Sequence, residues 1–174
     1  MLFRASTEAD IPAISCIYAH YVRHTTASFE IEPPDSVEMA RRRLHIVNAG
    51  LPYLVADDGG ELAGYAYASP YRPRAAYRFT VEDSIYLHPE HAGKGLGGAL
   101  LSRLIDACEH WGARQMVAVI GGSDNRPSIR LHEKFGFRHT GVLRAAGFKF
   151  GKWADSVLMQ RSIGQGDLTL PDSR

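Results

Sequence analysis

Residues 84–111 read SIYLHPEHAGKGLGGALLSRLIDACEHW, and this stretch decides the fold. A β-rich run from Val81 to Leu87 stops before Pro89, and a glycine-rich loop follows it. The glycines of this loop are Gly93, Gly95, Gly97 and Gly98. Apolar residues then recur every three or four positions from Leu96 to Trp111, which is the spacing of a helix with one buried face. The stretch therefore predicts a strand, a glycine loop and a helix in succession.

The glycine loop is suited to binding a phosphate group. A helix start leaves backbone N–H groups without partners and carries the positive end of the helix dipole. Glycine permits positive φ and lets an anion approach the backbone with no Cβ in the way. A P-loop would need Gly-Lys-Ser/Thr where this loop has Gly93-Lys94-Gly95, and no βαβ unit with a Rossmann fingerprint precedes it. An anion site is favoured over a plain turn between a strand and a core helix.

Composition narrows the class of protein. The 174 residues include 20 basic and 19 acidic side chains, with 45% hydrophobic and 22% charged residues. These values are ordinary for one soluble domain and supply no overall field for nucleic acid or for an anionic membrane. No apolar run approaches the length of a membrane span and no signal-peptide pattern is present, so we expect a cytoplasmic protein. Cys16 and Cys108 fall in apolar helical patterns, and we expect both to be buried free thiols. His88 and His91 lack further ligands nearby, so no metal site is expected.

Periodicity and turn signals give the element order β-α-α-β-β-β-α-β-α-β-β. Strands are predicted near residues 2–4, 53–56, 62–68, 81–87, 115–120, 137–143 and 156–161. Helices are predicted near residues 7–25, 36–48, 96–111 and 125–135. This order indicates one α/β domain over residues 1–163, with a mixed central sheet flanked by helices. Residues 164–174 are polar and are expected to form a frayed tail. The run Arg41–Arg43 is interpreted as a solvated helix face.

The glycine loop and this element order resemble the GNAT superfamily of acetyl-CoA-dependent N-acetyltransferases. A second block, residues 125–137, agrees with that resemblance, with Asn125, Ser128, His132 and Gly136-Phe137 at the superfamily spacing. Over residues 3–160 the chain more closely resembles the phosphinothricin and methionine sulfoximine N-acetyltransferases. That closer resemblance is carried by residues 70–77, 80–86 and 143–155.

The resemblance implies a GNAT-like fold and acetyl-CoA as cofactor and co-substrate. It places the pantetheine arm along the strand near 81–87, where that strand parts from the strand near 115–120. The cofactor-binding residues that it implies are Ile85, Tyr86, Leu87, Gly93, Lys94, Gly95, Leu96, Gly97, Gly98, Asn125 and Ser128. A backbone N–H of Tyr86 or Leu87 would polarise the thioester carbonyl. Ala92 stands where the superfamily loop often has Gln or Arg, so pyrophosphate binding is expected to depend on backbone N–H groups, Lys94 and the helix dipole.

Glu82 is the candidate base, because family enzymes have Glu at the matching position and a carboxylate there can take the ammonium proton. The alternative is an exposed strand-end carboxylate paired to Arg74 or Arg78. Asp83 is expected on the opposite face of a regular strand. His132 is the candidate donor of a proton to the leaving thiolate, or else a packed, hydrogen-bonded helix residue. Tyr86 is a weaker candidate for the same step.

Substrate recognition is assigned mainly to a basic loop. Arginine binds carboxylates and phosphinates in a bidentate manner, and Arg72 and Arg74 flank a proline just before Glu82. The alternative is a basic loop with surface salt bridges. The complete set of candidate substrate residues is Arg72, Arg74, Tyr77, Glu82, Asp83, Ser84, Phe29 and Lys149. Phe148 and Trp153 are interpreted as packing or dimer contacts.

We therefore expect direct attack of an α-amine on the thioester, without an acyl-enzyme. The substrate would be a small amino-acid analogue of the phosphinothricin or methionine sulfoximine/sulfone type, and any herbicide or antibiotic resistance could be incidental to a pocket for a metabolite. The alternatives are another amine (an amino acid, a polyamine or a protein N-terminus) or a non-catalytic acyl-CoA-binding module. The family resemblance implies a homodimer, and no nucleic-acid or membrane partner is expected.

Overall fold

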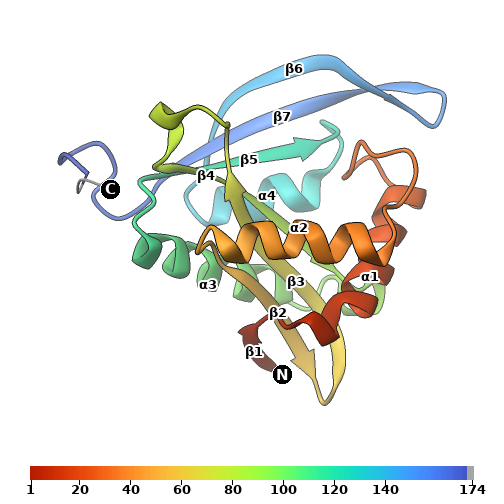
Figure 1. Cartoon of the computed structure of the whole chain (residues 1–174). Helices are drawn as coiled ribbons and strands as arrows, with labels where there is room; N and C mark the ends of the chain where they lie inside the picture. Colours follow the sequence, from red (N-terminus) through yellow and green to blue (C-terminus); the bar gives the residue numbers. More distant parts are fainter. Residues whose placement is uncertain (172–174) are drawn as a thin grey trace.

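A single mixed sheet organises the protein, with its strands in the order β1-β2-β3-β4-β5-β7-β6 (Figure 1). The computed structural model describes residues 1–171. The strands are β1 (Leu2–Ala5), β2 (Tyr53–Asp58), β3 (Glu61–Pro70), β4 (Thr80–Leu87), β5 (Gln115–Gly121), β6 (Arg138–Lys149) and β7 (Lys152–Ser162). The helices are α1 (Ile11–His24), α2 (Ser36–Asn48), α3 (Leu96–Trp111) and α4 (Arg126–Lys134). The predicted α/β class and element order are confirmed.

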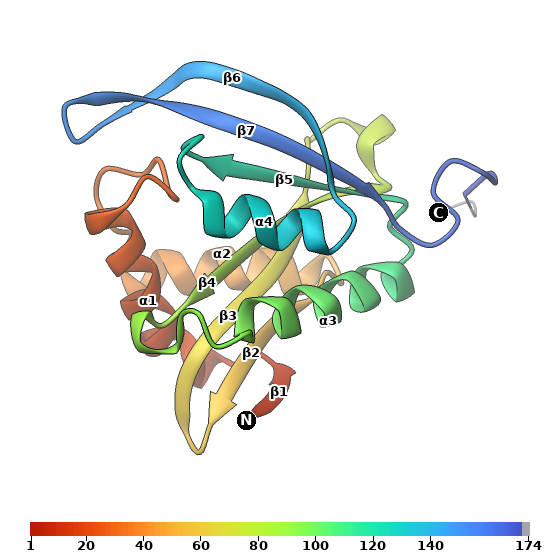
Figure 2. The ribbon, with the colours of Figure 1, turned by 180° about the vertical axis from the view of Figure 1, so that it is seen from behind.

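The helices cover the sheet from both sides. Helices α1 and α2 lie on one face (Figure 1), and α3 and α4 lie on the other, which the reverse view shows (Figure 2). The apolar faces of α1 and α3 supply fully buried residues such as Ile14, Leu100 and Leu104 to the core. Strands β4 and β5 run parallel and α3 makes the crossover between them, whereas every other neighbouring pair is antiparallel.

Strands β4 and β5 part halfway along their length. They pair only from Thr80 to Asp83 on β4 and from Gln115 to Ala118 on β5. Beyond these residues, 84–87 of β4 still pair with β3, and 119–121 of β5 still pair with β7. The sheet therefore divides into two halves at its centre, and the facing backbone edges of the two strands have no strand partner there.

The loop between α1 and α2 closes one end of this division. Gly121, the last residue of β5, lies directly under the loop, and a Cβ at this position would lie 1.9 Å from the carbonyl oxygen of Thr26. Only glycine permits so close an approach of two backbones. Gly121 therefore fixes where residues 25–29 sit relative to the sheet.

The hairpin of β6 and β7 is longer than the sequence predicted. Strands expected over 137–143 and 156–161 continue to Lys149 and Lys152, and the two-residue turn Phe150-Gly151 joins them. Both turn residues have positive φ (52° and 72°), as a type I′ turn requires. Phenylalanine is not a usual residue for such a turn, and nearly every residue of β6 is exposed. The sequence therefore shows no alternating apolar pattern that would reveal the strand.

Three smaller expectations concern the cysteines, the arginine run and the C-terminal tail. Cys108 is buried, and burial raises the pKa of its thiol to about 12, but Cys16 is exposed on α1, so the expectation of two buried thiols is wrong for Cys16. Arg41 binds Glu38 of its own helix, whereas Arg43 joins α2 to Ser6. The expected C-terminal tail is held up to Leu170 by Arg114, whose guanidinium donates to Thr169 Oγ1 (2.9 Å) and to the carbonyl of Leu170 (3.1 Å). Residues 172–174 lie outside the described part.

Candidate active site

The parting of β4 and β5 opens a cleft of about 490 Å³ on the α3–α4 side of the sheet. It is lined by the diverging ends of both strands, by the glycine loop, by the start of α4, and by Tyr21 and Ala27. Its size is that of an ordinary small-molecule or cofactor site. Most of the predicted cofactor residues lie in this lining: Ile85, Tyr86, Leu87, Gly93, Gly95, Gly97, Gly98, Asn125 and Ser128. Lys94 is exposed on the loop outside the lining, and Leu96 is buried in the core.

The glycine loop ends in the N-terminus of α3. Gly95 is the N-cap of this helix, with φ of +81°, and a Cβ there would project into open space. The unpaired N–H groups of the first turn and the helix dipole make this end attractive to an anion. Gly97 and Gly98 have a second role, because a Cβ on Gly97 would lie 3.3 Å from Leu131 of α4 and one on Gly98 would lie 3.3 Å from Phe135, which follows α4. These two glycines allow α3 and α4 to pack closely beneath the cleft.

The backbone of β4 presents alternate residues to the cleft. The N–H of His88 donates to the Ala63 carbonyl on the β3 side. Leu87 faces the other way: its N–H donates to the Tyr21 hydroxyl (3.3 Å), and its carbonyl accepts from that hydroxyl (2.9 Å). By the alternation of an antiparallel ladder, Ile85 also faces the cleft, whereas the N–H of Tyr86 points to β3. Of the two predicted carbonyl-polarising donors, Leu87 has the required orientation and Tyr86 does not.

The start of α4 forms the opposite wall. Asn125 caps this helix, and its side-chain oxygen accepts from the Ser128 N–H (3.4 Å). Both residues line the cleft, so the cap that stabilises α4 also brings polar atoms to the wall.

His132 and Asp83 meet at the inner end of the cleft. His132 Nε2 lies 3.0 Å from Asp83 Oδ2, and the two side chains are 5% and 2% exposed. On the other side of the ring, Nδ1 lies 2.7 Å from the Ser128 carbonyl oxygen. Burial lowers the pKa of His132, but the hydrogen bond and charge of Asp83 and the Ser128 carbonyl outweigh it, so the pKa is raised above 6.5. His132 is therefore a packed, hydrogen-bonded residue that also lines the cleft.

Glu82 lies on the other face of the sheet. Successive strand residues point in opposite directions, and Asp83 points toward α4, so Glu82 points toward the α1–α2 side. It sits between Ser69 of β3 and Val117 of β5, just before the two strands part. Burial raises the pKa of its carboxyl, the negative charge of Asp83 raises it further, and Arg72 opposes both. A carboxyl with a raised pKa beside a cleft is suited to proton transfer.

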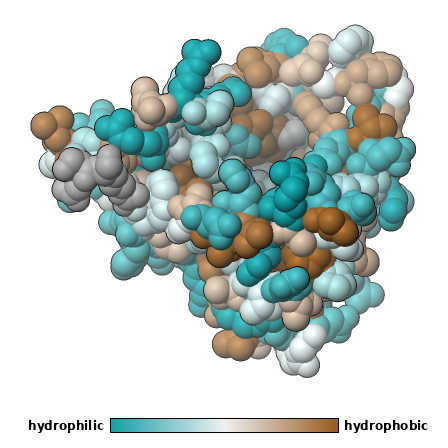
Figure 3. Space-filling view, in the orientation of Figure 1, coloured by the Kyte–Doolittle hydropathy of each residue, from teal (hydrophilic) through white to brown (hydrophobic). Residues whose placement is uncertain are grey.

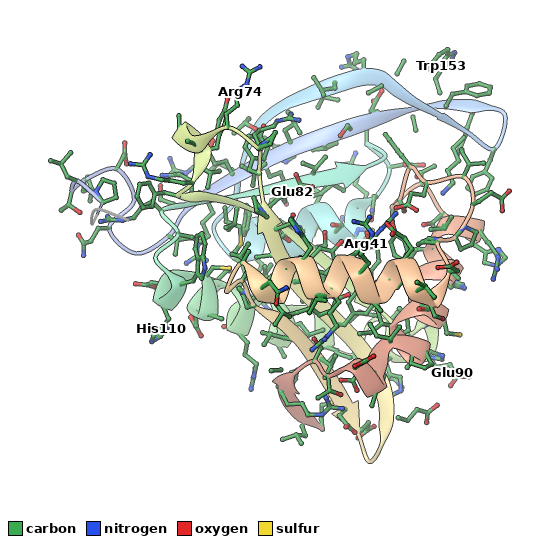
Figure 4. The ribbon with its side chains drawn as sticks, viewed as in Figure 1. Arg41, Arg74, Glu82, Glu90, His110 and Trp153 are labelled. Atoms are coloured by element: carbon green, nitrogen blue, oxygen red, sulfur yellow. The ribbon has the colours of Figure 1, made fainter. Side chains whose placement is uncertain are left out.

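The basic loop between β3 and β4 stands over Glu82. Figure 4 shows Glu82 near the middle of the sheet and Arg74 pointing outward from the loop. Arg72 stacks on the Tyr71 ring (4.9 Å to its centroid), and Tyr77 is 43% exposed. Within residues 1–171, none of the ion pairs involves Arg72, Arg74 or Arg78, so the predicted alternative of a salt-bridged surface loop is not observed. The space-filling view of this side shows a hollow surface between α2 and the hairpin (Figure 3).

Comparison with known proteins fits this geometry. The model of the acetyltransferase (GNAT) family matches residues 15–137. The chain belongs to this family. It is 54% identical over 97% of its length to a phosphinothricin N-acetyltransferase of Alcaligenes faecalis, covering 86% of that protein. It is 41% identical to an L-methionine sulfoximine/L-methionine sulfone acetyltransferase of Salmonella typhimurium, over 95% of this chain and 96% of the relative.

A solved structure shows the same architecture. It is a GNAT phosphinothricin acetyltransferase from Sinorhizobium meliloti in complex with AcCoA. The TM-score is 0.96 at 48% identity, over 99% of this chain and 93% of the other. The predicted GNAT-like fold, with a seven-stranded sheet flanked by four helices in residues 1–171, is confirmed.

Two of the predicted substrate residues of this acetyltransferase have structural partners. Lys149 is 4% exposed, and its ammonium group donates to the carbonyls of Thr25 (2.8 Å) and Ser28 (2.6 Å). Phe29 packs on Gly147, where a Cβ would lie 2.6 Å from its ring. Both contacts tie the loop between the first two helices to the hairpin. Asp83, another predicted substrate residue, faces His132 on the cofactor side, while Ser84 lines the cleft.

Sequence reasoning missed two features of the site. In the sequence, Tyr21 is one apolar position of an amphipathic helix. In the structure its hydroxyl hydrogen-bonds the backbone of Leu87, 66 residues away. The Asp83–His132 pair joins residues 49 apart, and no local pattern marks it. A signal for the pair did exist, because a carboxylate on the inward face of a buried strand requires a partner.

Proposed function

We propose that this protein transfers the acetyl group of acetyl-CoA to the α-amine of a small amino-acid analogue, of the phosphinothricin or methionine sulfoximine/sulfone type. The observation that carries the proposal is the parting of β4 and β5, which joins the cleft and the α3 N-terminus on one side of the sheet to Glu82 on the other. The names of the relatives support the substrate class.

The residues present fit acetyl-CoA. Its pyrophosphate would be held by the N–H groups of the loop from Gly93 to Gly98 and by the α3 dipole, where a Cβ at Gly93 or Gly95 would meet only open space. Its pantetheine arm would bond the backbone edge of β4 at Ile85 and, in exchange for the Tyr21 hydroxyl, at Leu87. When bound, acetyl-CoA supplies the acetyl group as an activated thioester.

Glu82 and the cleft residues divide the proton transfers. Glu82 accepts the proton of the substrate ammonium, directly or through water, because burial holds its pKa above the usual value. The Leu87 N–H is oriented to stabilise negative charge on the carbonyl oxygen, in exchange for its bond to Tyr21. His132 lines the cleft with both ring nitrogens bonded, to the Ser128 carbonyl oxygen and to Asp83 Oδ2, so the departing sulfur takes its proton from the attacking amine. Neither cysteine serves as nucleophile, since Cys108 is buried with a raised pKa and Cys16 lies outside the cleft lining.

Binding of the acidic groups of the substrate is assigned to the basic loop. Arg72 and Arg74 are exposed above Glu82 and form no ion pair within residues 1–171. Their guanidinium groups, that of Arg72 stacked on Tyr71, can bind a carboxylate and a phosphinate or sulfoximine group. A polyamine would be repelled by the same two side chains.

The hairpin supports association of two copies. It exposes large apolar side chains along its length, namely Val142 and Leu143 in the middle of β6 and Phe148, Phe150 and Trp153 near the turn. Trp153 is 67% exposed and stands at the far end of the hairpin (Figure 4). Exposed apolar groups gathered in one place favour an interface, and we propose a homodimer formed here.

We also propose a cytoplasmic enzyme without nucleic-acid or membrane partners, in keeping with the balanced charge. No helix within residues 1–171 has both the length and the apolar character to span a membrane.

Thiol release from acetyl-CoA, followed with a thiol-reactive dye, tests the proposal. Candidate amines are phosphinothricin, methionine sulfoximine, methionine sulfone, glutamate, spermidine and a short peptide. Saturable release with the first three is expected. Release with spermidine or peptide alone would overturn the substrate class. If acetyl-CoA raises the melting temperature and no amine is turned over, an acyl-CoA-binding module replaces the enzyme.

A further inference from the structure

A second cavity, of about 210 Å³, lies beneath the basic loop between β3 and β4. Two tyrosines of the loop, Tyr71 and Tyr77, cover it, and their rings meet edge-on at 5.7 Å between centroids. The sheet forms the opposite wall, with side chains that include Thr80, Val117, Leu158 and Gln160. None of the described residues that line this cavity is charged. It therefore offers aromatic and aliphatic surface together with neutral hydrogen-bonding groups.

The cavity lies on the same face of the sheet as Glu82. Thr80 precedes Glu82 by two residues on β4, Val117 is the register partner of Glu82 on β5, and Gln160 is the partner of Val117 on β7. Residues that are two apart on a strand, or opposite each other on paired strands, point to the same face. Two residues along a strand span about 7 Å. The cavity therefore begins about one side chain away from the proposed base.

The same cavity also approaches the cofactor cleft. Val119 of β5 lines the cleft, and its partner on β7, Leu158, lines the cavity. Opposed residues of paired strands have Cβ atoms about 5 Å apart. In phosphinothricin and in methionine sulfone, five bonds join the α-nitrogen to the terminal methyl carbon, which is about 6 Å in an extended chain. An amine held at Glu82 thus places the other end of such a molecule in the cavity.

Arg72 connects the cavity with Glu82. Its guanidinium stacks on the ring of Tyr71, 4.9 Å from the centroid. Burial raises the pKa of Glu82, and the positive charge of Arg72 opposes that rise, so the two side chains are near each other. A phosphinyl or sulfonyl group carries oxygens that accept hydrogen bonds and a methyl group that is apolar. An arginine at the rim suits the oxygens, and the aromatic and aliphatic walls suit the methyl.

We propose that the cavity beneath the basic loop is the subsite for the methyl-bearing phosphinyl or sulfonyl end of the substrate, and that Leu158 helps to set the size of the group it accepts. The inference rests on the proposed acetyl transfer and names the part of the substrate that the cavity selects. With the amine at Glu82 and the oxygens of this end at Arg72, Arg74 is left for the carboxylate. Glutamate is rejected because its planar carboxylate has no methyl group to bury.

A pair of Leu158 variants tests this subsite by changing its size. Leu158→Ala enlarges the cavity and should raise kcat/KM for ethionine sulfone relative to methionine sulfone about 10-fold or more, since one methylene in an apolar pocket changes specificity roughly 10–200-fold. Leu158→Phe fills the cavity and should raise KM for methionine sulfone about 10-fold or more, with KM for acetyl-CoA within about 2-fold of the parent value. Leu44→Phe, the same change at an exposed position of α2, is the matched control and should alter neither KM. Kinetic constants equal to those of the parent in both Leu158 variants would overturn the inference.

Saturation-transfer NMR examines the subsite without turnover. Methionine sulfone is added to the protein together with coenzyme A, which has no acetyl group to transfer, and the aromatic protons of the protein are irradiated. The sulfone methyl should receive more saturation than the α-proton, and Leu158→Phe should abolish the difference. Stronger saturation of the α-proton, or saturation of neither, would contradict the subsite. A saturated methyl combined with failure of every amine to release thiol from acetyl-CoA would count against the proposed acetyl transfer alone.

Discussion

Gly121→Ala is expected to damage the site through the loop between α1 and α2, not through any catalytic group. A Cβ at this position would lie 1.9 Å from the Thr26 carbonyl oxygen and 3.2 Å from the Phe29 ring. Because real contacts of a Cβ do not fall below 3.0 Å, the loop has to withdraw by about 1 Å or more. Overpacking of this kind costs roughly 1–3 kcal/mol.

The displaced loop carries part of the cleft. Ala27 lines the cleft and Lys149 bonds the carbonyls of Thr25 and Ser28, so withdrawal should loosen acetyl-CoA binding as well as the fold. At about 2–4 °C per kcal/mol for a chain of this size, the melting temperature should fall by roughly 2–12 °C. KM for acetyl-CoA should rise, whereas the pH profile of kcat should not change.

Gly141→Ala supplies the control. Gly141 lies in β6, and a Cβ there meets nothing within 4 Å. Replacing it should leave the melting temperature unchanged or raise it slightly, because glycine is unfavourable in strands by about 0.5–1 kcal/mol. Differential scanning fluorimetry with and without acetyl-CoA compares the two variants. Equal melting temperatures for both would refute the argument that Gly121 sets the position of the loop.

Three further predictions concern chemistry, recognition and stability. Glu82→Gln should lower kcat about 10²–10⁴-fold and leave acetyl-CoA affinity intact; an unchanged kcat would remove Glu82 from the mechanism. In the parent protein, kcat/KM should rise with pH as Glu82 loses its proton, at a pH above the ordinary Glu pKa of 4.5. Arg74→Ala should raise KM for phosphinothricin about 10-fold or more, while Arg41→Ala, on α2, should not; steady-state kinetics shows whether they differ. Because the pKa of His132 is raised on folding, its stabilising contribution is complete below pH 6.5 and is lost as pH rises through the raised pKa. Urea unfolding should show Asp83→Asn losing less stability at high pH than at pH 6, and a constant difference would contradict the ion pair.

The sequence predicts the elements well where their ends carry local signals. Helix α2 was expected over residues 36–48 and runs from Ser36 to Asn48, because Asp35 caps its start and Gly50, with positive φ, follows its end. The glycine loop and α3 were placed correctly for the same reason. The sequence predicts only the first half of β6, because both faces of this strand are exposed and its turn contains Phe150.

The site is predicted only in part, because it is built from separate parts of the chain. The resemblance pointed to Glu82, Leu87 and the glycine loop, and the structure sets them around one parting of strands. The bonds of Tyr21 to Leu87 and of Asp83 to His132 depend on how α1 and α4 dock on the two faces of the sheet. The docking of the helices determines which groups their side chains contact, and the spacing of residues along the sequence does not predict these contacts.

Titration of acetyl-CoA into nitrogen-15-labelled protein tests most directly whether the parting of β4 and β5 is the cofactor site. Binding there should shift the backbone amides of Ile85 and Leu87, which face the cleft, together with those of Gly93 to Gly98. The amide of Tyr86, which points to β3, should move less, and Gly141 on the far edge should not move. Saturable shifts confined to other surfaces, or shifts of Tyr86 larger than those of Leu87, would contradict the account.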